Sequence, residues 1–377
     1  MTKTIKITAI LLAALIIGSC TNDDIPSPPS SNGINAKASF SVARTSTKSD
    51  NDNSGDDDDE TIPYDAQISH LTVLIFNSAN ELVSVIQRNG SQISIEANPD
   101  HYEVIASLPL PESFVPETYT MLAYANVSNQ HFVNLGITDE SGAMRPGVDI
   151  TFTENVITLK SAKQASDAGE LIPMYGVLEA KADPATGGFD VGGVLRRAMA
   201  RINLKVADAG VVVTGNPPAE LGDFQMHRAY LYFSSQYGNI THKPDDYGQY
   251  VLNIPKKVSI LSGKETTPQT ANFADGVTQF DPIYTYEYDA NFFTDDPLLV
   301  IESSFSIENK PYTYFLSIKN PDTQEGISIY RNTEYDIEIT HVPYPDDTTP
   351  PVVPVNILYK IVIKPWETHE IPLPDYW

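Results

Sequence analysis

Residues 34–44 read INAKASFSVAR, and this stretch decides how the rest of the chain is interpreted. Its apolar side chains occupy every second position; they are Ile34, Ala36, Ala38, Phe40 and Val42. The residues between them are mostly polar, so an extended strand here would have one apolar and one polar face. The spacing therefore predicts an amphipathic β-strand. Arg44 ends it, just before a long polar and acidic stretch.

The composition of the chain favours an all-β protein with a packed core. Its 377 residues suffice for two domains, and 41% of them are hydrophobic. Abundant Val, Ile, Tyr, Phe and Thr, together with 28 prolines, favour short strands and turns over helices. The formal net charge of -25 argues against binding to nucleic acid and against adhesion to anionic lipid headgroups, because both need a basic surface.

The first 20 residues have the features of an export signal with a lipidation site. Two lysines precede an apolar segment, residues 7–17, which is too short to span a bilayer, since that takes roughly 20 residues. Residues 17–20, Ile-Gly-Ser-Cys, resemble the bacterial lipobox, whose cysteine is diacylated and becomes the new N-terminus. We therefore interpret residues 1–19 as a signal peptide and Cys20 as the lipidation site. An ordinary signal peptide with a chance cysteine is the alternative.

Cys20 is the only cysteine of the chain, so the folded part can contain neither a disulfide nor a cysteine-based zinc site. Residues 56–60 are five consecutive acidic residues, which repel one another and stay solvated. We interpret residues 45–67 as an acidic, protease-accessible linker. A calcium loop is the alternative, because residues 50–55, DNDNSG, match its beginning; Glu60, however, lies one position too early, and no helix pattern flanks the stretch.

Strand-like segments separated by turns predict two tandem antiparallel β-sandwiches, residues 68–190 and 191–341. Residues 187–193 are interpreted as a glycine-containing break, and we place the domain boundary near it. Residues 129–143 are compatible with a short helix or an irregular loop. The expected strands of the first domain are 68–76, 81–87, 102–106, 119–126 and 148–152. Those of the second are 228–233, 283–288, 298–305, 312–318 and 334–339.

The last segment, residues 342–377, is interpreted as a proline-rich arm that carries a strong strand. Five prolines lie in residues 342–354, where they remove hydrogen-bond donors and stiffen the backbone. Residues 356–364, NILYKIVIK, alternate as a strand does. Four large apolar side chains share one face of it; they are Ile357, Tyr359, Ile361 and Ile363.

These two strands suggest a way to assemble. Removing the strand of residues 34–43 from a sandwich would leave an apolar groove with unpaired backbone groups on both sides. The C-terminal strand of another copy could fill that groove by β-strand addition. Such a contact is heterologous and need not close, so it would build a filament.

Several stretches of the chain resemble fimbrillins, the type V pilins that are the major fimbrial subunits of oral and gut anaerobic bacteria. The matching stretches cover most of the chain; they are 68–76, 119–126 (YTMLAYAN), 171–176 (LIPMYG), 195–206 (LRRAMARINLKV), 284–287 (YTYE), 330–339 (YRNTEYDIEI) and 364–366 (KPW). For the fold, we expect sandwiches of the transthyretin-like type.

The resemblance implies a precursor that reaches the outer membrane as a lipoprotein through Cys20. An arginine-specific surface protease would cut between Arg44 and Thr45 and release the N-terminal strand. A donor strand within residues 352–377 of another copy, or of a related pilin, would then fill the groove, forming a fimbria that supports adhesion. Lys48 and Arg88 are rival cleavage sites. If Arg44 is simply the last residue of an ordinary strand, the chain would be an uncleaved anchor, a tip subunit or a plain surface lipoprotein.

The sequence contains no pattern that predicts an enzyme, a cofactor or a metal site. The seven histidines are scattered, and the chain lacks H-E-x-x-H, G-x-S-x-G and a phosphate-binding loop. The main competing function is glycan binding by a surface lipoprotein, in which Tyr284, Tyr286 and Tyr288 would stack against sugars. Alternating tyrosines in a strand are more often part of half-buried sheet packing.

Overall fold

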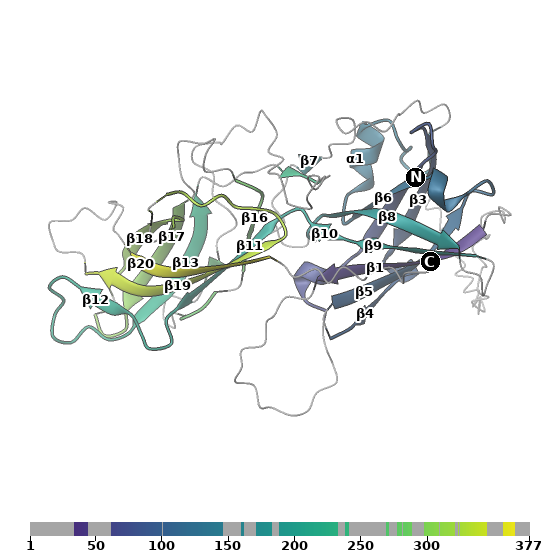
Figure 1. Ribbon diagram of the computed structural model, residues 1–377. Coiled ribbons are helices and arrows are strands. Elements are labelled where there is room, and N and C mark those ends of the chain that lie inside the picture. The colour runs from purple at the N-terminus through teal and green to yellow at the C-terminus, as the bar shows by residue number, and fades with distance from the viewer. Residues whose placement is uncertain are drawn as a thin grey trace, which may run out of the picture. The chain divides into compact units, whose positions relative to one another are not determined.

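The computed structural model describes residues 34–43, 62–99, 101–145, 160–161, 171–182, 188–232, 238–240, 269–270, 277–280, 282–288, 298–308, 310–320, 323, 325–344 and 357–365. Within these ranges the protein is nearly all β, which confirms the predicted fold class (Figure 1). The more specific transthyretin-like type stays a prediction. The predicted leader, the acidic run and the strand of residues 148–152 lie outside the described residues.

The described part of the first half forms one sheet of nine strands in the order β3-β2-β6-β8-β9-β1-β5-β4, with β10 paired to β8. The strands are β1 (Ile34–Ala43), β2 (His70–Phe76), β3 (Leu82–Asn89), β4 (Ile93–Ala97), β5 (His101–Leu110), β6 (Thr120–Ala125), β8 (Met174–Ala182), β9 (Phe189–Val194) and β10 (Arg196–Arg197). The two ends of the order, β3 and β4, are joined by the short 3-10 helix η2 (Gly90–Gln92). We call this the first sheet.

One face of the first sheet encloses a single core. Phe40 of β1, Val73 of β2 and Val104 of β5 are fully buried members of it. The opposite face of β2 and β6 packs under α1 (Asn129–Asn134), whose Phe132 contacts a second cluster that includes Leu74. Because both faces of β2 are covered, its sequence reads as a continuous apolar run. A further 3-10 helix, η3 (Pro116–Thr118), precedes β6.

The described part of the second half forms two sheets that face each other across one core, which is a β-sandwich. The second sheet contains β11 (Ala200–Val206), β12 (Val212–Thr214), β16 (Ile283–Thr285), β19 (Thr333–Pro343) and β20 (Leu358–Pro365). The third contains β13 (Phe224–Tyr232), β15 (Gln269–Thr270), β17 (Leu298–Phe305) and β18 (Tyr312–Ser317). A small separate pair is formed by β7 (Lys160–Ser161) and β14 (Gly238–Asn239).

Among the described strands most pairs are antiparallel, but three are parallel: β1 with β9, β11 with β19, and β12 with β19. The sequence pattern predicts antiparallel sandwiches and gives no sign of these pairs. Parallel strands need a long crossover connection, and their partners are therefore far apart in the chain. A period of two shows that a segment is a strand and which face is apolar, but not which strand lies beside it.

The glycine-containing stretch of residues 187–193 was expected to be a break, and this expectation is wrong. Phe189–Val194 is β9, which pairs with both β1 and β8. A Cβ added at Gly193 would lie 2.7 Å from the carbonyl oxygen of Val177 on β8. This glycine therefore permits close approach of two backbones inside the sheet. How the chain divides into domains stays a prediction, although a boundary at residue 190 would cut through β9.

Two other predicted boundaries differ from the structure. The predicted linker of residues 45–67 ends in a packed segment, because η1 (Tyr64–Ala66) contains two buried residues. The predicted arm begins at residue 342, but β19 continues to Pro343 and the side chain of Val342 is fully buried. In residues 129–143 the structure has the short helix α1, followed by a turn.

Candidate functional site

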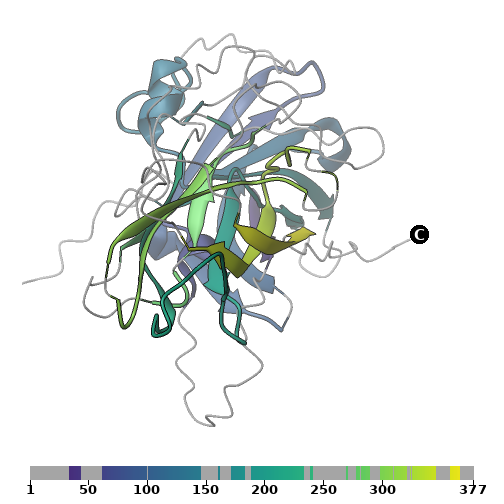
Figure 2. The same ribbon diagram turned by 90° about the vertical axis from the view of Figure 1, so that its left-hand side faces the viewer.

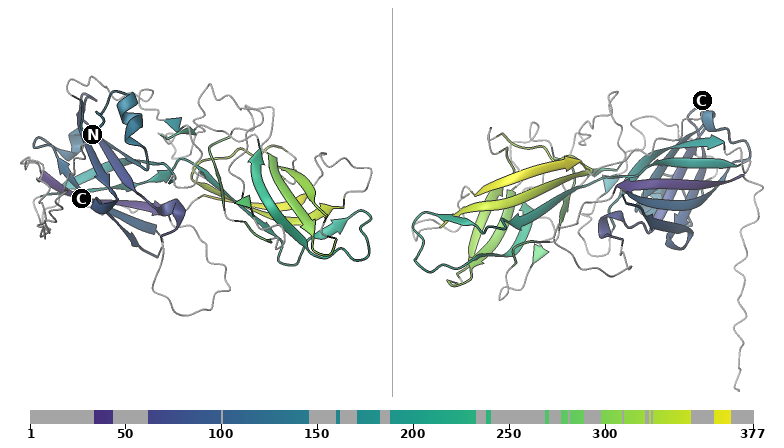
Figure 3. Two further views of the ribbon diagram at one scale, coloured as in Figure 1. Left: turned by 180° about the vertical axis from the view of Figure 1, so that it is seen from behind. Right: turned by 60° about the horizontal axis from the view of Figure 1, so that its bottom comes forward.

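The predicted removable strand, β1, lies inside the first sheet with a neighbour on each side (Figure 3). It pairs antiparallel with β5 over its whole length, from Ile34 opposite Leu110 to Ala43 opposite His101. Residues 36–41 also pair parallel with β9. Over residues 36–41, both rows of backbone groups of β1 therefore face another strand.

The predicted inner face of β1 points into the core of the first sheet. Ala36 is 2% exposed, and Ala38, Phe40 and Val42 are fully buried. Phe40 lies directly opposite Gly193 of β9 in the parallel register. The fifth residue of the predicted set, Ile34, belongs to β1, but its side chain is not described. The alternation in the sequence thus corresponds to a strand that closes an apolar core.

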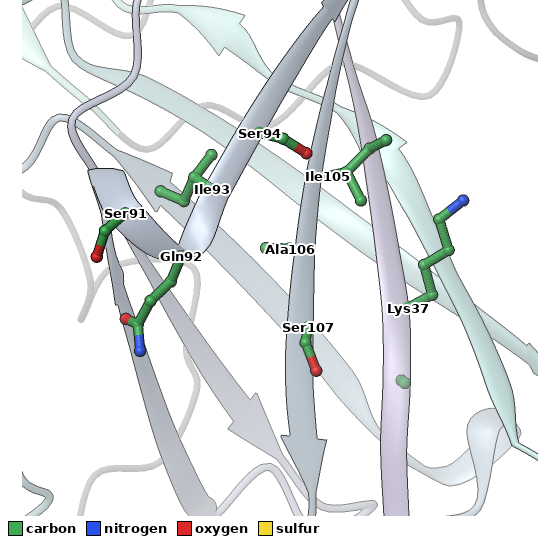
Figure 4. A pocket seen from close by; sticks show the side chains of 9 residues that line it. Lys37, Ser91, Gln92, Ile93, Ser94, Ile105, Ala106 and Ser107 are labelled. Carbon is green, nitrogen blue, oxygen red and sulfur yellow. The ribbon is translucent and has the colours of Figure 1, made fainter. Parts of the chain in front are cut away.

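The outer face of β1 is mostly polar, and its exposure varies along the strand, since Ser41 is only 3% exposed. Lys37 is exposed, and the hydroxyl group of Ser39 donates a hydrogen bond to the carboxylate of Glu103 on β5. Lys37 also borders a shallow pocket of about 570 Å³ between β1, β5, β4 and η2 (Figure 4). The remaining lining residues are Ala36, Ser91, Gln92, Ile93, Ser94, Ile105, Ala106 and Ser107.

Loss of β1 would change the first sheet in a defined way. The edges of β5 and β9 that now pair with it would present unpaired N–H and C=O groups, and the core beneath would be uncovered. Unpaired backbone groups that are shielded from water cost free energy, as does exposed apolar surface. The gap would therefore favour binding of another extended, amphipathic strand.

Three predicted site residues lie outside the part of the chain that the structure describes. Arg44, the predicted cleavage residue, comes directly after the last residue of β1, and Thr45 follows it. Cys20 belongs to the undescribed N-terminal segment. Processing at Arg44 and lipidation at Cys20 therefore remain predictions from the sequence.

The predicted donor strand, β20, lies at the edge of the second sheet, antiparallel to β19 (Figures 1 and 2). Among the described residues, β19 is its one paired neighbour. Ile357 is buried, and Tyr359 and Ile361 pack partly against the core. Ile363, the fourth member of the predicted inner face, is 46% exposed.

The hydroxyl group of Tyr359 connects β20 to the third sheet. It accepts a hydrogen bond from the backbone N–H of Lys319, with a distance of 2.7 Å. Its oxygen also lies 2.8 Å from the carbonyl oxygen of Ser317 and 2.7 Å from that of Lys319. A hydroxyl has one proton, so the two carbonyl groups share this donor.

A buried charge cluster holds the segment that precedes β2. The carboxylate of Asp65 lies 3.1 Å from the guanidinium of Arg201 and 3.8 Å from that of Arg197. Arg197 also donates a hydrogen bond to the backbone carbonyl of Asp65. Burial lowers the pKa of Arg197, and the nearby carboxylate of Asp65 opposes this shift. Asp65 thus compensates buried positive charge from β10 and β11.

Arg201 is also linked, through Asn203, to two carboxylates on β19. Arg201 donates a hydrogen bond to the side-chain oxygen of Asn203, and the amide nitrogen of Asn203 donates to the carboxylates of Glu334 and Asp336. Burial raises the pKa of Glu334, while the positive charge of Arg201 lowers it. These contacts join β11 and β19 beside the Asp65 cluster.

The sequence did not single out Asp65, Arg197, Arg201 or Tyr359 as structural links. The apolar stretch of residues 195–206 contains three arginines, and charges in such a stretch are rarely buried without a partner. This pattern could have predicted buried ion pairs. It could not have named Asp65 as the partner, because the contact spans more than 130 residues of sequence.

The tyrosines proposed as a sugar-stacking platform are buried: Tyr284 is 7% exposed, Tyr286 1% and Tyr288 2%. They are parts of the packed core and offer no exposed aromatic surface, so this basis for glycan binding is wrong. Among the described residues, no group of three or more His, Cys, Asp or Glu side chains could hold a metal ion. None of the helices in this part of the chain has the length and hydrophobicity that crossing a membrane requires.

Over most of its length, the chain has the same overall fold as a protein of known structure. A solved structure of a candidate cell adhesion protein from Parabacteroides distasonis superposes with a TM-score of 0.53 at 16% identity, covering 88% of this chain and 97% of that one. The truncated tip fimbrial protein Mfa3 from Porphyromonas gingivalis gives a TM-score of 0.47 at 11% identity, covering 88% and 100%. No curated protein matches the chain.

A family profile of fimbrillin-A associated anchor proteins, Mfa1 and Mfa2, matches residues 40–372, most of the chain. The match begins within β1 and extends beyond the end of β20. The chain therefore belongs to the family of fimbrillin-A associated anchor proteins.

Proposed function

We propose that this protein is a structural subunit of surface fimbriae that assembles by strand exchange after proteolysis and supports adhesion. Membership in the fimbrillin-A associated anchor family supports a fimbrial role at the cell surface. The observation that carries the finer proposal is the position of β1. It is the first described strand of the chain, yet it lies inside the first sheet with a buried inner face.

In this proposal Cys20 is lipidated and the precursor reaches the outer membrane as a lipoprotein. An arginine-specific surface protease cuts after Arg44 and frees β1 together with the lipid. Because β1 lies on the N-terminal side of that bond, a single cut removes its covalent link to the folded chain. The groove between β5 and β9 then accepts β20 of another copy or of a related pilin.

The cleavage step predicts the behaviour of an Arg44 variant. In the wild type, surface-extracted protein is expected to begin at Thr45 and to form ladders on unboiled gels. Arg44→Ala should keep Cys20 with its lipid and lose the ladder, because β1 stays in its groove. N-terminal sequencing and unboiled gel electrophoresis measure the two outcomes.

Two controls make this experiment specific. Arg44→Lys should behave like Arg44→Ala if the protease requires arginine, and Lys48→Ala should mature and assemble normally. Normal maturation and normal ladders in Arg44→Ala would contradict the proposed cleavage site.

A second candidate function is that of a fimbrial anchor, which the family description favours. An anchor would keep β1 and the lipid on Cys20 and hold the base of a fimbria in the outer membrane. The same N-terminal sequencing separates the two candidates. A wild-type chain that retains Cys20 in assembled fimbriae is an anchor, whereas one that begins at Thr45 is an exchanged subunit.

A further inference from the structure

We propose that the hydrogen bonds of the Tyr359 hydroxyl hold the C-terminal strand β20 on its own subunit and thereby set how readily this strand is released. We call this contact the catch. The use of the released strand by a second copy rests on the proposed function. The catch itself is a property of the single folded chain and can be tested on it alone.

The two ends of β20 are held very differently. Near its start, Ile357 is 4% exposed and belongs to the core of the sandwich. On the same face toward its end, Ile363 is 46% exposed, and the described structure gives this part no paired strand other than β19. The outer face is exposed at both ends, with Leu358 at 56% and Val362 at 50%. A strand that is bonded along one edge and half exposed at one end opens from that end. Opening of β20 therefore begins near Pro365 and proceeds toward Tyr359.

As β20 separates from its C-terminal end, Tyr359 is the residue that is hydrogen-bonded to the other sheet of the sandwich. Its hydroxyl group bonds to the backbone of Ser317 and Lys319, which lie at and just beyond the end of β18. The other contacts described for β20 are its ladder and apolar packing, the bond from the Thr340 hydroxyl to the carbonyl of Leu358, and the exposed ion pair of Lys360 with Glu338; both of these polar partners lie on β19. Breaking the contact leaves one backbone N–H and two carbonyl groups of the third sheet without this partner, which is unfavourable where water does not replace it. Release past Tyr359 is therefore costlier than fraying before it.

The test is Tyr359→Phe in the full chain, with hydrogen exchange of the β20 amides measured by mass spectrometry. The substitution keeps the ring and removes only the hydroxyl. We expect exchange in residues 358–365 to become about tenfold faster, the factor that corresponds to losing net hydrogen bonding of this kind. Exchange in β1 and the rest of the first sheet should not change.

Tyr314→Phe is the matched control. Its hydroxyl donates to the backbone carbonyl of Pro343 on β19 in the same sandwich, with a distance of 3.1 Å, so its loss removes a hydrogen bond to a strand other than β20. Faster exchange in residues 358–365 for Tyr359→Phe alone supports the catch. Unchanged exchange there, equal acceleration by both variants, or acceleration confined to residues 317–319 would each overturn it.

An assembly measurement separates the catch from the proposed function. If a released β20 serves as donor, Tyr359→Phe should form ladders faster than the wild type after cleavage. Faster exchange of β20 without faster ladder formation would support the catch and count against β20 as the donor strand of the proposed assembly.

Discussion

Replacing Phe40 with alanine is expected to destabilise the unprocessed protein by about 3–5 kcal/mol, the range for truncating a fully buried aromatic side chain. Phe40 is fully buried in the core of the first sheet, on a strand with neighbours on both sides. Its removal leaves a cavity opposite Gly193, which has no side chain to fill the space. Urea unfolding followed by circular dichroism measures the change as a lower midpoint concentration.

Lys37→Ala is the matched control for Phe40→Ala. Lys37 lies on the same strand, three residues earlier, but its side chain is exposed. Its replacement should change the free energy of unfolding by no more than about 0.5 kcal/mol. A loss below about 1 kcal/mol for Phe40→Ala would show that β1 does not contribute to the core as the structure describes.

The shape of the inner face of β1 also constrains the strand that could replace it. Two small residues, Ala36 and Ala38, are followed by Phe40 and Val42. A donor strand must therefore place a large side chain where Phe40 is now, or it leaves a cavity. Among the alternating residues of β20, Tyr359 is the one aromatic side chain. The same tyrosine would thus hold β20 on its own subunit and offer the bulk needed in the groove.

Much of this fold could be predicted because most strands carry their burial pattern in their own residues. The apolar residues of 34–43 alternate, and in β1 all the described members of that set are buried. The predicted strand of residues 298–305 coincides with β17, and its burial continues on both faces of the strand. Local alternation and β-branched content suffice for such segments.

What could not be predicted depends on contacts between distant residues. β9 contains Gly192 and Gly193, which weaken a strand locally, and Gly193 is favoured because β8 approaches closely there. Asp65 was part of a predicted solvated linker, because it follows a run of acidic residues. Its burial depends on Arg197 and Arg201, whose positions in space the sequence does not give. The sequence pattern similarly places Tyr359 on the apolar face of a strand, but it gives no sign of the hydrogen bonds between its hydroxyl group and the end of β18.

Replacing Asp65 with alanine is expected to cost about 3–5 kcal/mol of unfolding free energy, because it leaves buried positive charge without its partner. Asp65 is 2% exposed, Arg197 is fully buried and Arg201 is 7% exposed. Since burial already lowers the pKa of Arg197, removing the opposing carboxylate makes its charged state still less favourable. Urea unfolding of the purified protein measures the effect.

Glu302→Ala provides the comparison for Asp65→Ala. Glu302 and Arg228 form an ion pair at 2.8 Å, but their side chains are 40% and 31% exposed, so breaking this pair should cost less than about 1 kcal/mol. Similar losses for the two variants would contradict a role for burial in the Asp65 cluster.

The proposed cleavage at Arg44 also separates Asp65→Ala from Phe40→Ala, because Asp65 lies after Arg44 and Phe40 before it. Asp65→Ala should therefore destabilise both the unprocessed and the assembled subunit, whereas Phe40→Ala should destabilise only the unprocessed form.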